Sequence, residues 1–325
     1  MAQRNYEEKV NSSDGSNANS KDISFFEIEP TRVITGDADR QRYLYYQLKI
    51  SMLKAKKIDI IVSFLMESGV RLLLNDLKKA LDRVVKIRLL TGNYLGITHP
   101  SALYLIKDKL GDQVDLRFYN EKDRSFHPKA YIFHGEKDSE IYIGSSNMSK
   151  SALTSGIEWN YRLNKHRDEK SFNQFSQTFE ELFTNHSIII DDKILRDYSK
   201  AWKKPAVAKD IERLDEGPIE DKNVEEFIRP RGAQIEALYS LKNVRDEGAD
   251  KGLVYAATGI GKTYIAAFDS LPYERVLFVA HRKEILEQAA DSFKNIRKSD
   301  DFGFFDGDNK ETDKAVIFAS VASLG

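Results

Sequence analysis

The segment "HPKAYIFHGEKDSEIYIGSSNMSKSALTSGIEWN" spans residues 127–160, and its pattern decides the fold expected for the first part of the chain. The apolar runs "KAYIF" and "IYIG" predict two strands, in which successive side chains point to opposite faces of a sheet. On this pattern His127 and Lys129 share one face of the first strand, and His134 lies on the other face. Gly144 permits a tight turn after the second strand.

The polar residues of this segment suit chemistry at phosphorus. An imidazole is a nucleophile, and a neighbouring ammonium can hold the negative charge that develops on phosphate oxygens. A hydroxyl and an amide can donate hydrogen bonds to the same oxygens, and a carboxylate can fix the tautomer of a histidine. The candidate catalytic residues are therefore His127, Lys129, Ser145, Asn147 and Glu158.

Strands and helices alternate on either side of this segment. The apolar runs predict strands at 58–65, 85–92 and 114–119, and the first of these is expected to be buried on both faces. Helical spacing of apolar residues predicts helices at 68–81, 100–110 and 169–183. The fold class expected from this alternation is α/β, with helices layered on a sheet.

The composition changes along the chain and predicts four regions. Residues 1–22 include "NSSDGSNANSKD" and have little to bury, so we expect a disordered tail. Residues 23–190 hold the strands and helices above. Residues 191–222 are charged, contain two prolines and are interpreted as a linker. Residues 223–325 form a second βαβ series, which predicts a parallel sheet.

The spacing H-x-K, then G-S-x-N, then a Glu eleven residues after the Asn resembles the phospholipase D superfamily, in particular its small nuclease and restriction-endonuclease branch. The resemblance covers about residues 23–183 and implies a phospholipase D-like layered α/β domain. It implies that His127 forms a phosphohistidine intermediate, that Lys129 and Asn147 stabilise the transition state, that Ser145 assists at the phosphate, and that Glu158 orients a histidine. It also implies that the nuclease needs no metal or cofactor.

Two features depart from that family's pattern. The family usually has Asp seven residues after the His, whereas this chain has His134, whose side chain is expected to point away from His127. The chain also holds one copy of the motif, because the H-x-K of His281 to Lys283 is not followed by G-S-x-N. Relatives of this kind pair two chains, so the resemblance predicts a homodimer through the nuclease domain, with two His127 side chains facing each other.

A second motif, "GLVYAATGIGKTYIAA" at 252–267, predicts a strand at Gly252–Ala256, a loop, and a helix that starts at Lys262. Amides at a helix N-terminus can cradle a phosphate, a lysine can reach the β and γ oxygens, and a threonine hydroxyl can hold Mg²⁺. The motif resembles motif I of superfamily 2 helicases. The nucleotide-binding candidates are Thr258, Gly259, Ile260, Gly261, Lys262 and Thr263, with Thr263 as the Mg²⁺ ligand. The upstream stretch "RPRGAQIEAL" resembles the adenine-reading segment of these helicases, which implies that Gln234 contacts adenine, with Arg231 nearby.

Two further blocks, "RVLFVAHRKEILEQA" at 275–289 and "AVIFASVASL" at 315–324, resemble the next segments of such helicases. The resemblance implies a partial RecA-like parallel α/β domain that uses ATP and Mg²⁺. The acidic Mg²⁺-binding motif and the second RecA-like domain of these motors are not found before Gly325. We therefore expect a segment truncated inside its motor, with weak nucleotide binding and no efficient ATP hydrolysis.

The composition limits the setting in which the protein acts. The formal net charge is -1, so a general basic excess does not argue for nucleic acid, and the absence of Cys suits a reducing cytoplasm. No signal peptide or membrane span is expected. The sequence favours a DNA endonuclease fused to a helicase module, resembling restriction or anti-phage systems. A phosphatidyl- or phosphodiester-transferase and a non-catalytic DNA-binding module stay open as alternatives, as does RNA as the substrate.

Overall fold

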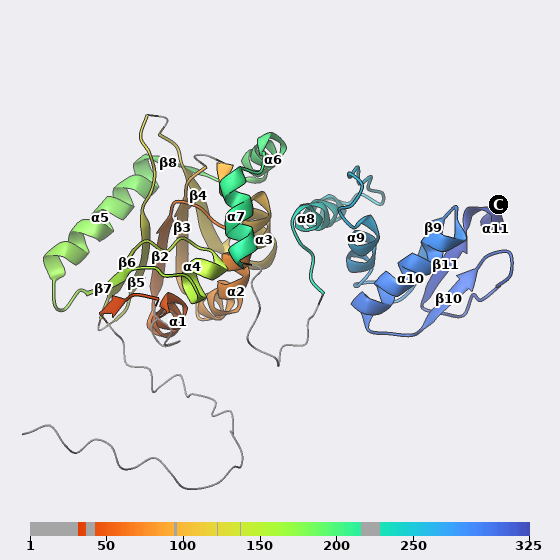
Figure 1. Cartoon of the computed structure of the whole chain (residues 1–325), viewed down its shortest axis with the longest axis horizontal. Coiled ribbons are helices and arrows are strands. Elements are labelled where there is room, and N and C mark those ends of the chain that lie inside the picture. The colour runs from red at the N-terminus through yellow and green to blue at the C-terminus, as the bar shows by residue number, and fades with distance from the viewer. Residues whose placement is uncertain (1–31, 37–42, 94–95, 122, 137, 216–227) are drawn as a thin grey trace, which may run out of the picture. The chain divides into compact units, whose positions relative to one another are not determined.

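The computed structural model describes residues 32–36, 43–93, 96–121, 123–136, 138–215 and 228–325, and the predicted tail at 1–22 lies outside them. The described residues form a large mixed sheet and a small parallel sheet, each accompanied by helices (Figure 1). The α/β class predicted from the sequence is confirmed.

The larger sheet follows the order β1-β7-β6-β5-β2-β3-β4-β8. Strands β2, β3 and β4 are parallel to one another, and the other neighbouring pairs are antiparallel. The strands are β1 (Val33–Ile34), β2 (Lys57–Val62), β3 (Lys86–Thr91), β4 (Val114–Tyr119), β5 (Lys129–His134), β6 (Glu140–Gly144), β7 (Asn160–Asn164) and β8 (Ser187–Ile189).

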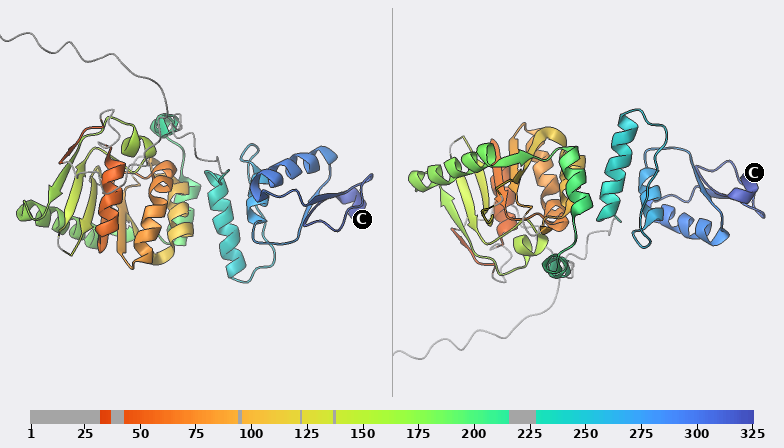
Figure 2. Two further views of the ribbon diagram at one scale, coloured as in Figure 1. Left: turned by 90° about the horizontal axis from the view of Figure 1, so that it is seen from below. Right: turned by 90° about the horizontal axis from the view of Figure 1, so that it is seen from above.

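Helices cover both faces of this sheet, as Figure 2 shows. They are α1 (Leu44–Lys54), α2 (Glu67–Asp82), α3 (Pro100–Leu110), the short 3-10 helix η4 (Gly111–Gln113), α4 (Lys150–Thr154), α5 (Glu169–Asn185), α6 (Asp192–Ala201) and α7 (Ala206–Asp215). Strand β2 is buried on both faces, as predicted: Ile58 and Ile60 pack with α1, α2 and α3, whereas Ile61 packs in the core that α5 covers.

The stretch interpreted as a linker contains α6 and α7. Leu195 of α6 is fully buried in the larger core, and Asp215 at the end of α7 is buried as well. The part of this stretch that the structure describes therefore packs as folded helices, and the domain boundaries themselves stay predictions.

The smaller sheet has the order β10-β11-β9, and all of its strands are parallel. The elements of this region are α8 (Ala233–Asp246), α9 (Lys262–Asp269), β9 (Val276–Ala280), α10 (Lys283–Arg297), β10 (Phe302–Phe305), β11 (Val316–Ser320) and α11 (Val321–Leu324). Phe293 of α10 and Phe318 of β11 are buried in its core. None of the helices among the described residues is long and apolar enough to cross a bilayer.

The strand predicted at Gly252–Ala256 is wrong. The segment forms no ladder with any described residue, and Leu253 and Tyr255 are 95% and 100% exposed. An apolar run becomes a strand only when a neighbouring strand satisfies its N–H and C=O groups, and here no neighbour does so. The prediction used the pattern of the segment and had no information about its partner.

A buried charge network joins β2, β3 and β5. Arg88 donates two hydrogen bonds to Asp59, from Nε at 2.7 Å and from Nη2 at 3.1 Å, and His134 Nε2 lies 2.8 Å from the same carboxylate. Asp59 is 2% exposed and Arg88 is 5% exposed. Burial opposes ionisation of Asp59, but the hydrogen bonds from His134 and Arg88 outweigh it and lower the pKa of Asp59 to about 2.

We predict that Asp59→Asn destabilises the fold by about 3–5 kcal/mol, because it leaves the buried Arg88 guanidinium with only the half-exposed Glu180 as a counter-charge. Since folding lowers the pKa of Asp59, its stabilising contribution is present above the ordinary pKa of 3.8 and is lost as the pH falls towards about 2. Urea unfolding of both proteins from pH 7 to pH 2 measures this. Asp197→Asn, which breaks only the exposed pair with Lys193, is the control and should change little. Equal stability of the Asp59→Asn and wild-type proteins at pH 7 would contradict the prediction.

Candidate active site

The strand register aligns the predicted catalytic segments at one end of the strands β2, β5, β6 and β7. Val62 of β2 pairs with Lys129 of β5, and Gly144 of β6 pairs with Asn160 of β7. Strands β5 and β6 pair through Ala130 and Ile143, so Lys129 and Gly144 come next in that ladder. The loops that leave this row carry the candidate side chains, which are separated in sequence but adjacent in space.

His127 lies before β5, not on it, since the strand begins at Lys129. The prediction that both residues share one strand is therefore wrong for His127. The physical reason is that Pro128 has no N–H to donate to a neighbouring strand, so the ladder does not extend to His127. The Lys129 ammonium turns back and donates to the His127 carbonyl oxygen at 2.9 Å. Lys129 is half-buried, whereas His127 is exposed.

Glu158 lies close to two other candidate catalytic residues, Ser145 and Lys129. Its carboxylate accepts a hydrogen bond from the Ser145 hydroxyl. Burial lowers the pKa of the Lys129 ammonium, and the nearby Glu158 carboxylate opposes this shift. Burial, with a smaller contribution from Glu158, also raises the pKa of Tyr131. The structure thus brings Glu158, Ser145 and Lys129 together, and the predicted role of Glu158 in orienting a histidine stays a prediction.

The Ser145 loop is fixed by backbone contacts with the start of β7. Ser145 N donates to Trp159 O at 3.1 Å, and Trp159 N donates to Ser145 Oγ at 3.1 Å. Asn160 Nδ2 donates to Ser146 Oγ at 2.8 Å, in the buried interior of the same loop. The loop therefore presents Ser145 outward and anchors Ser146 inward.

Asn147 is buried, and the residues that follow β2 hold its side chain. Its Oδ1 accepts a hydrogen bond from Phe64 N at 3.2 Å, and Ser63 Oγ donates to Pro128 O at 3.3 Å. The loop after β2 thus contacts both motif segments. Sequence reasoning missed Ser63 and Phe64, because only the sheet order shows that β2 lies beside β5.

The other histidines lie elsewhere. His134 sits at the far end of β5 from Lys129, where it contacts Asp59 and the ring of Phe172. This agrees with the expectation that it points away from the site. Of the remaining four, His99 lies against Trp202 and Glu212, His166 is in the turn after β7, His186 contacts Glu121, and His281 follows β9.

The phosphate loop precedes helix α9, as predicted. Gly261 has a φ of +77°, a left-handed conformation that favours glycine, and it is the N-cap of the helix that begins at Lys262. The Lys262 ammonium donates to the carbonyl oxygens of Ala257 at 3.0 Å and Ala256 at 3.3 Å. Amides at a helix N-terminus, a lysine and the Thr263 hydroxyl are the groups that a nucleotide phosphate with Mg²⁺ requires, so these residues fit that ligand.

Gln234, the predicted adenine contact, and Arg231 lie beside the same loop. Gln234 Nε2 donates to Ile260 O at 2.8 Å, and Arg231 N donates to Gln234 Oε1 at 3.0 Å. Gln234 therefore joins Arg231 to the phosphate loop. Of the other candidates, Thr258 and Gly259 are exposed at the tip of the loop.

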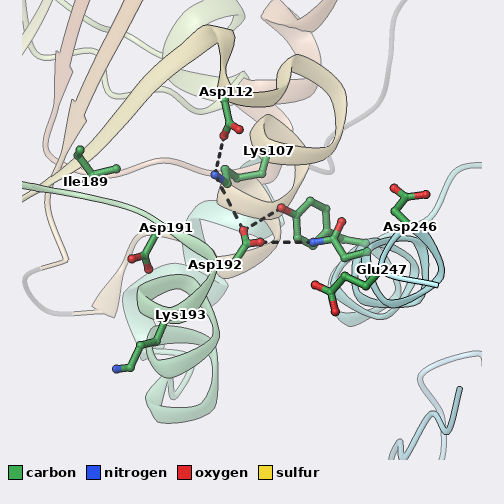
Figure 3. A pocket seen from close by; sticks show the side chains of 10 residues that line it. Lys107, Asp112, Ile189, Asp191, Asp192, Lys193, Asp246 and Glu247 are labelled. Carbon is green, nitrogen blue, oxygen red and sulfur yellow. Dashed lines mark hydrogen bonds and ion pairs between the residues drawn. The ribbon is translucent and has the colours of Figure 1, made fainter. Parts of the chain in front are cut away.

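An open pocket elsewhere contains none of the predicted catalytic or nucleotide-binding residues (Figure 3). Lys107 Nζ donates to Asp112 at 3.0 Å, and Tyr239 donates its hydroxyl proton to Asp192 at 2.9 Å. These four side chains pair with one another, so this part of the pocket is better explained as a paired polar surface than as a reaction centre.

We predict that Gly144→Ala disrupts the predicted catalytic edge. A Cβ at this position would lie 2.0 Å from Trp159 O and 2.7 Å from Asn160 Cα, so β6 and β7 would have to separate. Such overpacking costs about 1–3 kcal/mol, measured by thermal or urea unfolding. Gly307→Ala is the matched control, because its Cβ would meet no atom within 4 Å. A Gly144→Ala protein as stable as that control would contradict the register.

Comparison with known families gives two matches. Residues 49–183 match the family model described as "Cardiolipin synthase, PLD-like domain". Residues 227–325 match the family model described as "Type III restriction enzyme, res subunit". Comparison with curated proteins gave no match.

Several solved structures resemble the chain. NucT from Helicobacter pylori is 11% identical with a TM-score of 0.39, over 49% of this chain and 97% of that chain. Nuc from Salmonella typhimurium, a phospholipase D family member, is 17% identical with a TM-score of 0.35, over 45% and 90%. Phosphatidylserine synthase from Haemophilus influenzae is 14% identical with a TM-score of 0.41, over 57% and 46%.

The two family matches follow each other in the order of the two motif groups, so the resemblance predicted from the sequence is confirmed. The first match contains the H-x-K and G-S-x-N motifs, and the second contains the phosphate loop. The chain therefore joins a segment similar to phospholipase D-like domains to a segment similar to the res subunit of type III restriction enzymes.

Proposed function

We propose that the phospholipase D-like segment is a metal-independent endonuclease that cleaves DNA through a phosphohistidine intermediate. One observation carries the proposal: the three strands β5, β6 and β7 align Lys129, Gly144 and Asn160 in one row, and the loops that bear His127, Ser145 and Glu158 adjoin this row. An exposed histidine, whose carbonyl oxygen accepts a hydrogen bond from the half-buried Lys129 ammonium, can supply a nucleophile, and the ammonium can stabilise negative charge.

In the first step, a ring nitrogen of His127 attacks phosphorus and forms an N–P bond, while the P–O bond to the leaving nucleoside breaks. Lys129, Asn147 and Ser145 hold the oxygens of the pentavalent transition state. The leaving oxygen takes a proton from a second imidazole. Water then attacks phosphorus, gives its proton to that imidazole, and breaks the N–P bond, which restores both histidines.

The second imidazole is proposed to come from His127 of a second copy. The other five of the six histidines have positions elsewhere: His99 contacts Glu212, His134 contacts Asp59, His186 contacts Glu121, His166 lies in the turn after β7, and His281 follows β9. A two-fold pairing through the nuclease domain would supply the missing acid from an identical residue. The active protein is thus a homodimer with one composite site.

The res-like segment favours nucleic acid as the substrate. A nuclease attached to a module that binds ATP and Mg²⁺ at Lys262 and Thr263 suits DNA restriction or anti-phage defence in the cytoplasm. The family description of the first segment as cardiolipin synthase-like supports a second candidate, phosphatidyl transfer by the same His127. The attached res-like segment has no role in that chemistry, so we favour the nuclease.

Plasmid cleavage in excess EDTA tests the proposal. We expect wild-type protein to nick or linearise the plasmid, and His127→Ala to lose at least about 1,000-fold in rate while still binding DNA. His166→Ala, in the turn beyond the far end of β7, should cleave like wild type. Parallel assays use a single-stranded RNA and anionic phospholipid vesicles. Turnover of lipid but not plasmid would establish the transferase, and binding without any cleavage would establish the non-catalytic module.

Nucleotide binding tests the second segment separately. We expect a fluorescent ATP analogue with Mg²⁺ to bind weakly to wild type, and Lys262→Ala to weaken that binding about tenfold, because the lysine neutralises the β and γ oxygens. Lys298→Ala, at the C-cap of α10, is the control. Equal affinities of the wild-type and Lys262→Ala proteins would remove the phosphate-loop assignment without affecting the nuclease.

A further inference from the structure

Helix α4 begins three residues after Asn147 in the sequence, and residues from distant parts of the chain accept hydrogen bonds from its first backbone amides. Ser151 N donates to Asp215 Oδ1 at 2.6 Å, and Lys150 N donates to Ser68 Oγ at 3.2 Å. The Ser68 hydroxyl in turn donates to the other oxygen of Asp215. One carboxylate from α7 therefore ties the start of α4 to the first turn of α2.

This carboxylate is buried. Asp215 is 7% exposed, and so is Asn147, while Ser149 between Asn147 and α4 is 2% exposed. Removing a buried acceptor leaves its donors without partners, and water has little access to replace it. The amide of Ser151 and the hydroxyl of Ser68 would both lose their acceptor if Asp215 were truncated.

Helix α2 and the residues that lead into it also hold the Asn147 loop. Met66 N donates to Met148 O at 2.9 Å, and Phe64 N donates to the Asn147 side chain at 3.2 Å. A Cβ at Gly69 of α2 would lie 2.3 Å from Met148 O, so helix and loop are in direct backbone contact. A shift of α4 relative to α2 would therefore move Asn147 away from Phe64.

Helix α7 itself is anchored to the larger sheet's helices. Glu212 lies 3.1 Å from His99 Nε2 at the N-cap of α3, and it also pairs with Lys204. Asp215 is the last residue of α7, and the res-like match begins at residue 227. The carboxylate that holds α4 thus lies where the chain leaves the nuclease towards the second segment.

We propose that Asp215 is a positioning residue for Asn147, so that the nuclease site depends on α7, the last described helix before the res-like segment. The inference rests on the proposed function for its catalytic meaning, but the contacts that carry it are independent of activity. Asp215 touches no substrate; it acts through α4 and the Asn147 loop.

Hydrogen exchange of the full chain tests the contact without an activity assay. We compare Asp215→Ala with Asp210→Ala, which removes an exposed carboxylate from the same helix. Exchange in peptides that contain Phe64 and Ser151 should become about tenfold faster in Asp215→Ala only. Asp215→Asn, which keeps one acceptor oxygen but turns an NH₂ towards the other donor, is the milder variant should the alanine protein not fold. Unchanged protection at Phe64 in the folded variant overturns the inference.

Kinetics test the catalytic consequence. Asp215→Asn should lower kcat on plasmid by about 10- to 100-fold with little change in KM, because Asn147 acts on the transition state. Added to Asn147→Ala, it should cost little more, since the two residues act as a unit. Full additivity would show a separate structural role and overturn the inference. If wild type and His127→Ala are equally inactive, the proposed function fails, and the exchange experiment still decides the role of Asp215.

Discussion

The antiparallel pairing of β5, β6 and β7 is the constraint on which the candidate site depends. Side chains alternate between the two faces of a strand, so a shift of one residue in this register would move Lys129 to the other face of the sheet. The close approach of Gly144 to Trp159 O and Asn160 leaves no room for such a shift. The short distance between two backbones thus fixes which polar groups share one solvent-facing edge.

The charged groups at the two ends of β5 differ in burial and pairing. At the His134 end, Asp59 and Arg88 are buried and paired, and aromatic rings of α5 cover them: Arg88 lies 4.9 Å from the Phe179 ring centroid. At Lys129 the ammonium donates to the carbonyl oxygen of the exposed His127, and the nearby Glu158 carboxylate opposes the lowering of its pKa by burial. A buried network stabilises one arrangement of strands, and the open end of the same strand carries the proposed catalytic residues.

The sequence predicts the elements of this fold better than it predicts their neighbours. Apolar runs locate β2, β3 and β4, and the motif spacing locates the site segments, because both signals are local. Gly252–Ala256 has the same local signal but forms no strand, since pairing depends on a partner elsewhere in the chain. The contacts of Phe64 with Asn147 and of Asp215 with Ser151 likewise have no local signal, because they join residues 83 and 64 positions apart.

The resting position of Lys262 has a consequence for ligand selection. Its ammonium is held by two neutral carbonyl oxygens at the entrance of α9. An incoming anion therefore meets a cation whose long side chain is already ordered, and it has to displace two dipoles and not a counter-ion. A di- or triphosphate can make this exchange favourable, whereas a neutral nucleoside cannot. Under the proposed function, the loop would therefore select its ligand by charge before any contact with the base forms.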